Sequence, residues 1–235
     1  MANAFVQSKF ANANTASSVS TTAPAVSTTA GNLLVALVTI SNKGAVSSFT
    51  DSAGNTYTLG PAINSGATWW TSEIWYCFNA ASVSSSGGSW TANGPGSSDY
   101  ALLVMEYSGL GTGSLRTSGT VDQGSSSTSW SACTSAGSAT AGDLVVAMAG
   151  QSNGSGTAGG SFTDRYNTAT SSAAVSGADI LSSGSGSQSV SWTLSPAKDG
   201  SAAIAVFAPA AAAGPDVVDL DWAADPGVAV LASDY

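Results

Sequence analysis

The stretch TAGNLLVALVTISN at residues 29–42 decides the fold, because it appears a second time in the chain. Residues 140–153 read TAGDLVVAMAGQSN, and the two stretches align without a gap, with eight of fourteen positions identical. Each places a Gly-containing turn before a run of apolar and β-branched residues, and each run is too short to cross a membrane. This pattern is typical of a buried β-strand that follows a tight turn.

Three further pairs of blocks occur in the same order in the two parts of the chain. They are SFTD at 48–51 and 161–164, SWT at 89–91 and 191–193, and ALLVM at 101–105 with AIAVF at 203–207. Four matching blocks in one order indicate an internal duplication. We therefore expect two related halves, about residues 1–110 and 111–210.

Both halves consist of short apolar segments separated by Gly, Ser and Asn, and no stretch keeps apolar residues at helical spacing. The sequence predicts an all-β fold over residues 1–210, an internally duplicated antiparallel β-sandwich or jelly roll. Two separate small sandwiches are the alternative. The joined form is favoured because residues 110–127, between the halves, contain no Pro-rich hinge. Residues 211–235 are predicted to form a linker and an extended acidic C-terminal tail.

Composition and charge limit the classes of partner. Hydrophobic residues make up 43% of the chain and charged residues only 8%, so Ser, Thr, Asn and Gly must supply most of the polar surface. The net charge is -9 and the five basic residues are scattered singly, which disfavours phosphate backbones and anionic lipids. We expect no nucleic-acid partner and no membrane association. The first ten residues also lack the features of a secretory signal.

Catalytic chemistry finds little support in the residues. The chain has no histidine, which removes the Ser-His-Asp triad and histidine-ligated zinc. Glu73 and Glu106 are the only glutamates, and both fall on predicted strands, where we expect them to face outward as ordinary surface carboxylates. Residues 71–73 are expected at an exposed edge. The sequence thus predicts no catalytic residues, no cofactor and no enzyme.

Asp51 and Asp164 occupy equivalent positions in the two halves, and DSAGN at residues 51–55 offers oxygen atoms that a calcium ion could use. Asp and Asn in turns more often accept hydrogen bonds from their own backbone. We favour the turn and predict no metal site. Cys77 and Cys133 are the only cysteines, and we favour two buried thiols over a disulfide, which the sequence alone leaves open.

The tryptophans divide into core and surface candidates. Trp75, Trp90 and Trp192 are expected in the core, because two of them recur at one position of the duplication. Trp69 and Trp70 are adjacent, so on a strand one of them must point away from the core. This pair is our candidate for contact with surface glycans.

The C-terminal tail differs in composition from the rest of the chain. Residues 214–235 contain five of the fourteen acidic residues, no basic residue, and apolar side chains among the acids. A solvated tail is one interpretation; a segment that docks on another subunit, by adding a strand or lying in a groove, is the other. The predicted partner-docking residues are Val217, Leu220, Trp222, Val228, Val230 and Leu231.

Several motifs together resemble a β-sandwich module found in phage virion proteins and in large bacterial surface proteins. They are GNLLVA at 31–36, TDSAGNTYT at 50–58, IWY at 74–76, EYSG at 106–109 and SFTDR at 161–165, and the similarity spans roughly residues 3 to 208. The resemblance implies a display or packing module with no catalytic residues. The tail from residue 214 onward is not part of the module.

A module of this kind without a secretory signal fits a particle that is assembled in the host cytoplasm and released by lysis. We therefore expect a structural protein of a bacteriophage virion, a capsid decoration or minor capsid protein attached through its C-terminal tail. Its expected partners are other capsid or tail subunits and copies of itself, as a homo-oligomer. A phage tail accessory protein and a carbohydrate-binding or adhesion module are the alternatives.

Overall fold

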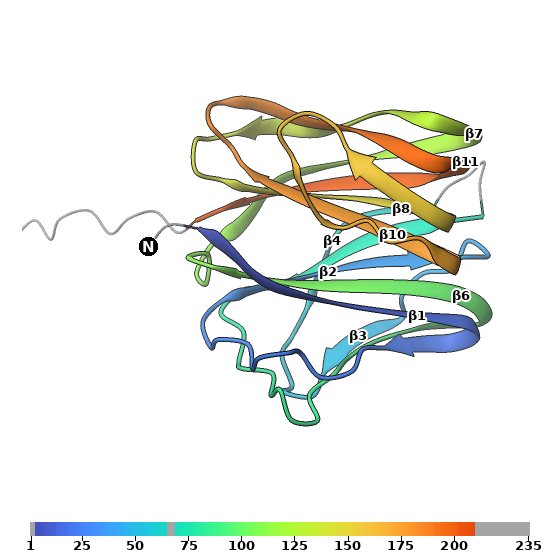
Figure 1. The fold of residues 1–235 in the computed structure, drawn as a ribbon. Helices are drawn as coiled ribbons and strands as arrows, with labels where there is room; N and C mark the ends of the chain where they lie inside the picture. Colours follow the sequence, from blue (N-terminus) through green and yellow to red (C-terminus); the bar gives the residue numbers. More distant parts are fainter. Residues whose placement is uncertain (1–2, 65–68, 210–235) are drawn as a thin grey trace, which may run out of the picture.

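The computed structural model describes residues 3–64 and 69–209, and the structural statements below concern these residues (Figure 1). They form eleven β-strands and no helix, which confirms the prediction of an all-β fold. None of these residues belongs to a helix long and apolar enough to span a membrane. The strands make two antiparallel sheets that pack face to face as a sandwich.

The first sheet comes entirely from the first half of the chain. Its spatial order is β1-β6-β2-β5-β4, and β3 pairs with β6 outside this path. The strands are β1 (Ala4–Ser20), β2 (Leu33–Ile40), β3 (Ser48–Asp51), β4 (Thr58–Asn64), β5 (Thr71–Cys77) and β6 (Trp90–Ser108).

The second sheet comes entirely from the second half, in the order β7-β11-β8-β10-β9. Apart from β3, this repeats the order of the first sheet, with the first strand of each half at one edge and beside the last strand. The strands are β7 (Ser114–Ala139), β8 (Leu144–Ala158), β9 (Thr163–Tyr166), β10 (Thr170–Leu181) and β11 (Gly186–Ala208).

The repeated TAG turn has the same backbone geometry in both halves. Gly31 has a φ of 90° and Gly142 a φ of 88°, a region in which residues with a side chain are strained. The N–H of Gly31 donates to Ala80 O, and the N–H of Gly142 donates to Ser182 O. The same turn therefore delivers the chain into β2 and into β8.

The closing strands correspond in a different register from the one that the sequence blocks indicate. Leu33 pairs with Tyr107, and its counterpart Leu144 pairs with Phe207, so Phe207 takes the place of Tyr107 rather than of Met105. The match of 101–105 with 203–207 is therefore wrong by two residues. Side chains on a strand alternate with period two, so this shift keeps every residue on its expected face and is invisible in the apolar pattern.

Apolar side chains fill the space between the sheets and also cover both outer faces. Leu37 and Leu103 meet Val146 and Met148 in the central cluster. Trp90 lies in the cluster outside the first sheet and Trp192 in the cluster outside the second. Long strands make this possible, because they bend back over their own sheets (Figure 1).

The β7–β11 ribbon illustrates the bend. Cys133 pairs in register with Val190, yet its Sγ lies 3.6 Å from Ala202 O, much farther along β11. The same bend brings the Trp130 indole N–H to Lys198 O, to which it donates a hydrogen bond. A strand that bends in this way buries both of its faces, and the outer surface of the sheet becomes an additional core.

Candidate functional site

Two ends of the sandwich differ in chemistry. We call the end that contains Leu33, Leu144 and Ala208 the terminal end, because both described ends of the chain lie there (Figure 1). β2 runs from Leu33 to Ile40, at the distal end, where Thr71 starts β5 opposite Ile40. The terminal end holds the ion pairs Arg116–Asp143 and Arg165–Asp179, and the distal end holds the exposed Trp69.

Glu106 organises the first TAG turn. Its Oε1 accepts hydrogen bonds from Thr29 N at 2.7 Å and Asn32 Nδ2 at 2.6 Å. Its Oε2 accepts one from Gln7 Nε2 at 2.7 Å, and the same amide nitrogen also donates to Val26 O. The carboxylate is buried and joins β1, β6 and the loop before β2.

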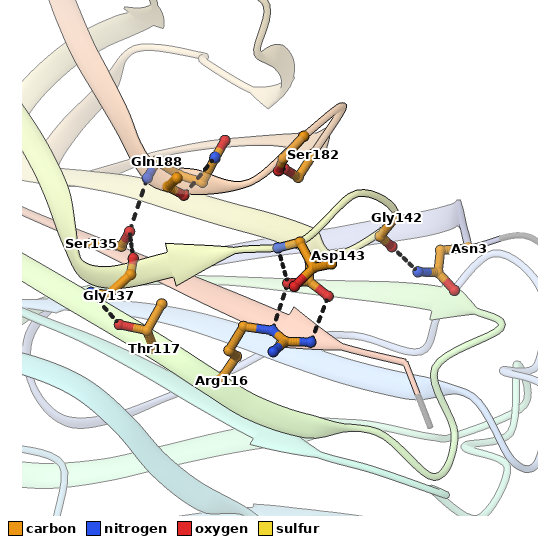
Figure 2. Close-up of polar contacts among 12 residues, drawn as sticks. Asn3, Arg116, Thr117, Ser135, Gly137, Gly142, Asp143, Ser182 and Gln188 are labelled. Atoms are coloured by element: carbon orange, nitrogen blue, oxygen red, sulfur yellow. Dashed lines mark hydrogen bonds and ion pairs between the residues drawn. The ribbon is translucent and has the colours of Figure 1, made fainter. Parts of the chain in front are cut away.

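Asp143 organises the second TAG turn from a different position (Figure 2). Its Oδ2 accepts a hydrogen bond from Thr140 N at 2.8 Å and lies 2.7 Å from Arg116 Nε. Asn3 donates its side-chain amide to Gly142 O in the same turn, which fastens the start of the chain to the second sheet. In this half the carboxylate belongs to the turn itself, while Val206 takes the strand position that corresponds to Glu106.

A third polar cluster bridges the two sheets at the terminal end. Arg165 on β9 makes a two-pronged ion pair with Asp179 on β10, with N–O distances of 2.7 and 2.9 Å. Tyr107 on β6 donates its hydroxyl to Asp179 Oδ2 at 2.7 Å. The guanidinium carbon of Arg165 lies 4.2 Å from the centre of the Phe5 ring, a cation–π contact.

Burial, then the charge of Asp179, raises the pKa of Tyr107 well above its ordinary value. The hydrogen bond to Asp179 likewise raises the pKa of Arg165. Tyr107 therefore keeps its proton and Arg165 its charge, so the cluster acts as a structural clamp between the sheets. The sequence offers little sign of it beyond one feature, an aspartate at 179 directly between the apolar residues Ala178 and Ile180.

The sequence predicted that Glu73 and Glu106 lie on the surface, and this prediction is wrong. Both side chains are buried, as are Thr71 and Ser72, so the prediction of an exposed edge at 71–73 is also wrong. Both glutamates do point to the outer face of their sheet, but the loops and the bent strands cover that face. Glu73 accepts hydrogen bonds from Val46 N and the Trp75 indole, and burial raises its pKa.

Asp51 uses its carboxylate inside the turn, in the way that the sequence favoured. Its Oδ1 accepts hydrogen bonds from Ala53 N and Asn55 N. Its Oδ2 accepts from the Asn55 side chain and from the Tyr57 hydroxyl. Asp164, its counterpart, accepts from Ala158 N and the Asn167 side chain. The described residues contain no group of three or more potential metal-ligating side chains.

One of the two adjacent tryptophans is exposed and the other buried, as predicted, although both precede β5 and do not lie on a strand. Trp69 is 65% exposed at the distal end, and Trp70 is buried in the cluster between the sheets. Trp90 and Trp192 are buried as expected, whereas Trp75 is only partly buried. Trp69 is therefore the member of the pair that a ligand can reach.

Both cysteines are free and buried, in agreement with the favoured interpretation. Cys77 lies in the cluster outside the first sheet and Cys133 in the cluster outside the second, so the whole sandwich separates them. Burial raises the pKa of Cys133 to about 12 and also raises that of Cys77. Neither thiol is prepared to act as a nucleophile.

The predicted partner-docking residues of the tail lie outside the described residues. They are Val217, Leu220, Trp222, Val228, Val230 and Leu231.

Comparisons of the chain with protein-family models, curated proteins and solved structures found no match.

Proposed function

We propose that the chain is a structural protein of a bacteriophage particle, a capsid decoration or minor capsid subunit held through its C-terminal segment. The observation that carries the proposal is the opposite placement of two features. β11 ends at Ala208 at the terminal end, so the acidic tail is attached there, while Trp69 and the loops around it lie at the distal end. A module attached by one end exposes the other to the surroundings.

The use of the carboxylates supports a structural role. Glu106, Asp143 and Asp179 each accept two or more hydrogen bonds or ion-pair contacts from the protein itself. Paired general acid and base groups must instead reach a substrate. The resemblance of the motifs to virion modules adds to this argument.

Incorporation into particles tests the proposal. Tagged full-length chain and a variant without residues 214–235 would be produced during infection, and particles would be purified on a density gradient. We expect the full-length chain in the particle band and the truncated chain at the top of the gradient, with the two showing the same circular dichroism. Trp69→Ala, at the opposite end, is the matched control and should be incorporated normally. Equal incorporation of the truncated chain would rule out attachment through the tail.

A carbohydrate-binding or adhesion role is the second candidate, and the exposure of Trp69 favours it. An exposed indole can stack on the apolar face of a sugar ring. Binding on a glycan array that is lost in Trp69→Ala but kept in Leu59→Ala, a change at another exposed apolar residue, would support it. Absence of binding by the full-length chain would exclude a glycan partner from the set tested.

A further inference from the structure

A cleft of about 420 Å³ opens at the terminal end, between the start of β1 and the edge formed by β9 and β10. This volume lies in the range of about 300–1,000 Å³ that is usual for ligand-binding clefts. Its apolar lining comes from Phe5, Leu144, Ile180 and Leu181, and Leu181 is 45% exposed. The cleft can therefore accept an apolar side chain from outside the sandwich.

In the two ion pairs at this end, the exposed partner is the positive one. Asp143 and Asp179 are buried, whereas the side chains of their partners Arg116 and Arg165 are 39% and 26% exposed. Arg165 is itself part of the cleft wall. Each ion pair thus hides its carboxylate and presents part of its guanidinium, so an acidic segment would meet favourable charge here.

The C-terminal tail contains a segment with the matching chemistry. Residues 216–222 read DVVDLDW. In an extended chain alternate side chains point to opposite sides, so over residues 218–222 Val218, Leu220 and Trp222 share one side and Asp219 and Asp221 the other. Before this stretch, Asp216 falls on the apolar side and Val217 on the acidic side. From Val218 to Trp222 such a strand has an apolar side for the cleft and an acidic side that can approach the exposed guanidinium of Arg165.

The chain is long enough to bring this segment to the cleft. Phe207 pairs with Leu144, and Leu144 pairs with Leu181, so the cleft lies one to two strands from the end of β11. Neighbouring strands are about 4.8 Å apart. Residues 209–215 can span about 3.3 Å each when extended, which covers the distance more than twice. A tethered segment also has a high effective concentration at a nearby site.

We propose that residues 216–222 occupy the terminal-end cleft of their own sandwich, with Trp222 against the apolar lining and Asp219 and Asp221 near the guanidinium of Arg165. In the free protein this cleft holds the tail. A partner that takes the tail must first displace it, so the proposed attachment to a particle acquires a competing internal state. The cleft can be occupied whether or not the attachment exists, so the two are tested separately.

Disulfide trapping in the full-length chain tests the proposal. We would compare Leu181→Cys with Leu59→Cys, each combined with Ala223→Cys next to Trp222. Leu59 is a matched control, because it is 44% exposed and lies on β4, at the opposite edge. The native Cys77 and Cys133 are buried and common to both variants. Oxidation in a glutathione buffer would be followed by intact mass and non-reducing electrophoresis.

We expect the intramolecular disulfide to form at least tenfold faster with Leu181→Cys than with Leu59→Cys. Adding Trp222→Ser, which removes the apolar anchor, should cancel most of this difference. Equal rates in the two variants, or a difference that survives Trp222→Ser, would overturn the proposal. Predominance of disulfide-linked dimers would overturn it as well, because the tail would then occupy a second copy. The particle-incorporation experiment has a separate readout, so either idea can fail alone.

Discussion

Replacement of Glu106 by Ala should destabilise the sandwich strongly, because it removes one acceptor group from several donors. Thr29 N and Asn32 Nδ2 both donate to its Oε1; Asn32 is buried, whereas Thr29 lies in an exposed part of the turn. A buried donor such as Asn32 Nδ2 that loses its acceptor costs about 1–3 kcal/mol, and the loss of the bond from the more exposed Thr29 N costs about 0.5–1.5 kcal/mol, so the two together cost about 1.5–4.5 kcal/mol. Gln7 keeps its second acceptor, Val26 O, so the loss of its bond to Glu106 should add little to the loss of stability.

Glu106→Gln separates the acceptor from the charge. The amide oxygen can still accept from Thr29 N and Asn32 Nδ2. The charge assistance is lost, together with the bond from Gln7 to Oε2, but Gln7 keeps Val26 O as an acceptor. We expect a cost of about 1–2 kcal/mol, the difference between hydrogen bonds to charged and to neutral groups. Urea unfolding followed by tryptophan fluorescence would give the free energy of unfolding of each variant.

The second half supplies the matched control for this reasoning. Asp143→Ala removes one acceptor from the N–H of Thr140 and one partner from Arg116, which is partly exposed and can turn to water. The loss should therefore be smaller than for Glu106→Ala, about 1–3 kcal/mol. The reasoning fails if Glu106→Ala unfolds at the same urea concentration as the original chain. It also fails if the Gln variant is as unstable as the Ala variant.

Three further outcomes can be measured on the same preparation. Burial raises the pKa of Glu73 from its ordinary value of 4.5, so the folded state binds more protons than the unfolded chain between the two pKa values, and stability falls as pH rises through this window. Glu73→Gln should remove that slope from urea midpoints measured against pH, and an unchanged slope would assign it to other groups. Cys77 and Cys133 should react with a thiol reagent only after unfolding, and immediate reaction of either in the native protein would contradict their burial. Trp90→Phe should cost about 1 kcal/mol more than Trp192→Phe, because only Trp90 donates its indole N–H, to the Tyr57 hydroxyl, and equal losses of unfolding free energy would argue against that bond.

The sequence was sufficient for the fold class, because repeated blocks and β-type periodicity are local signals. It also anticipated that one of Trp69 and Trp70 is exposed and the other buried, although the alternation along a strand that it assumed does not apply, because both residues precede β5. The expected exposure of Glu73 failed because it assumed a sheet with one solvated face. Only the bending of the long strands covers that face, and bending depends on contacts between residues as distant as Cys133 and Ala202.

The terminal-end cluster could not be found from the sequence. Tyr107 and Asp179 come from different halves and meet only when the sheets pack. Arg165 follows a repeated motif, but its partner lies fourteen residues further on, across the β9–β10 pair. Residue types show which groups can pair, while the packing of the two sheets decides which of them do.

The two TAG turns make the halves of this chain no longer interchangeable. Asn32 Nδ2 lies 2.6 Å from Glu106 Oε1. Asn32→Asp alone would put a second carboxylate in this position and so set two negative charges against each other. Loss of Glu106 alone would leave the turn without its acceptor, so either single step from the first arrangement toward the second is harmful. We therefore expect the two substitutions to be epistatic, with each tolerated only when the other is present. A chimera built from two copies of one half would therefore have to transplant the turn and the closing strand together.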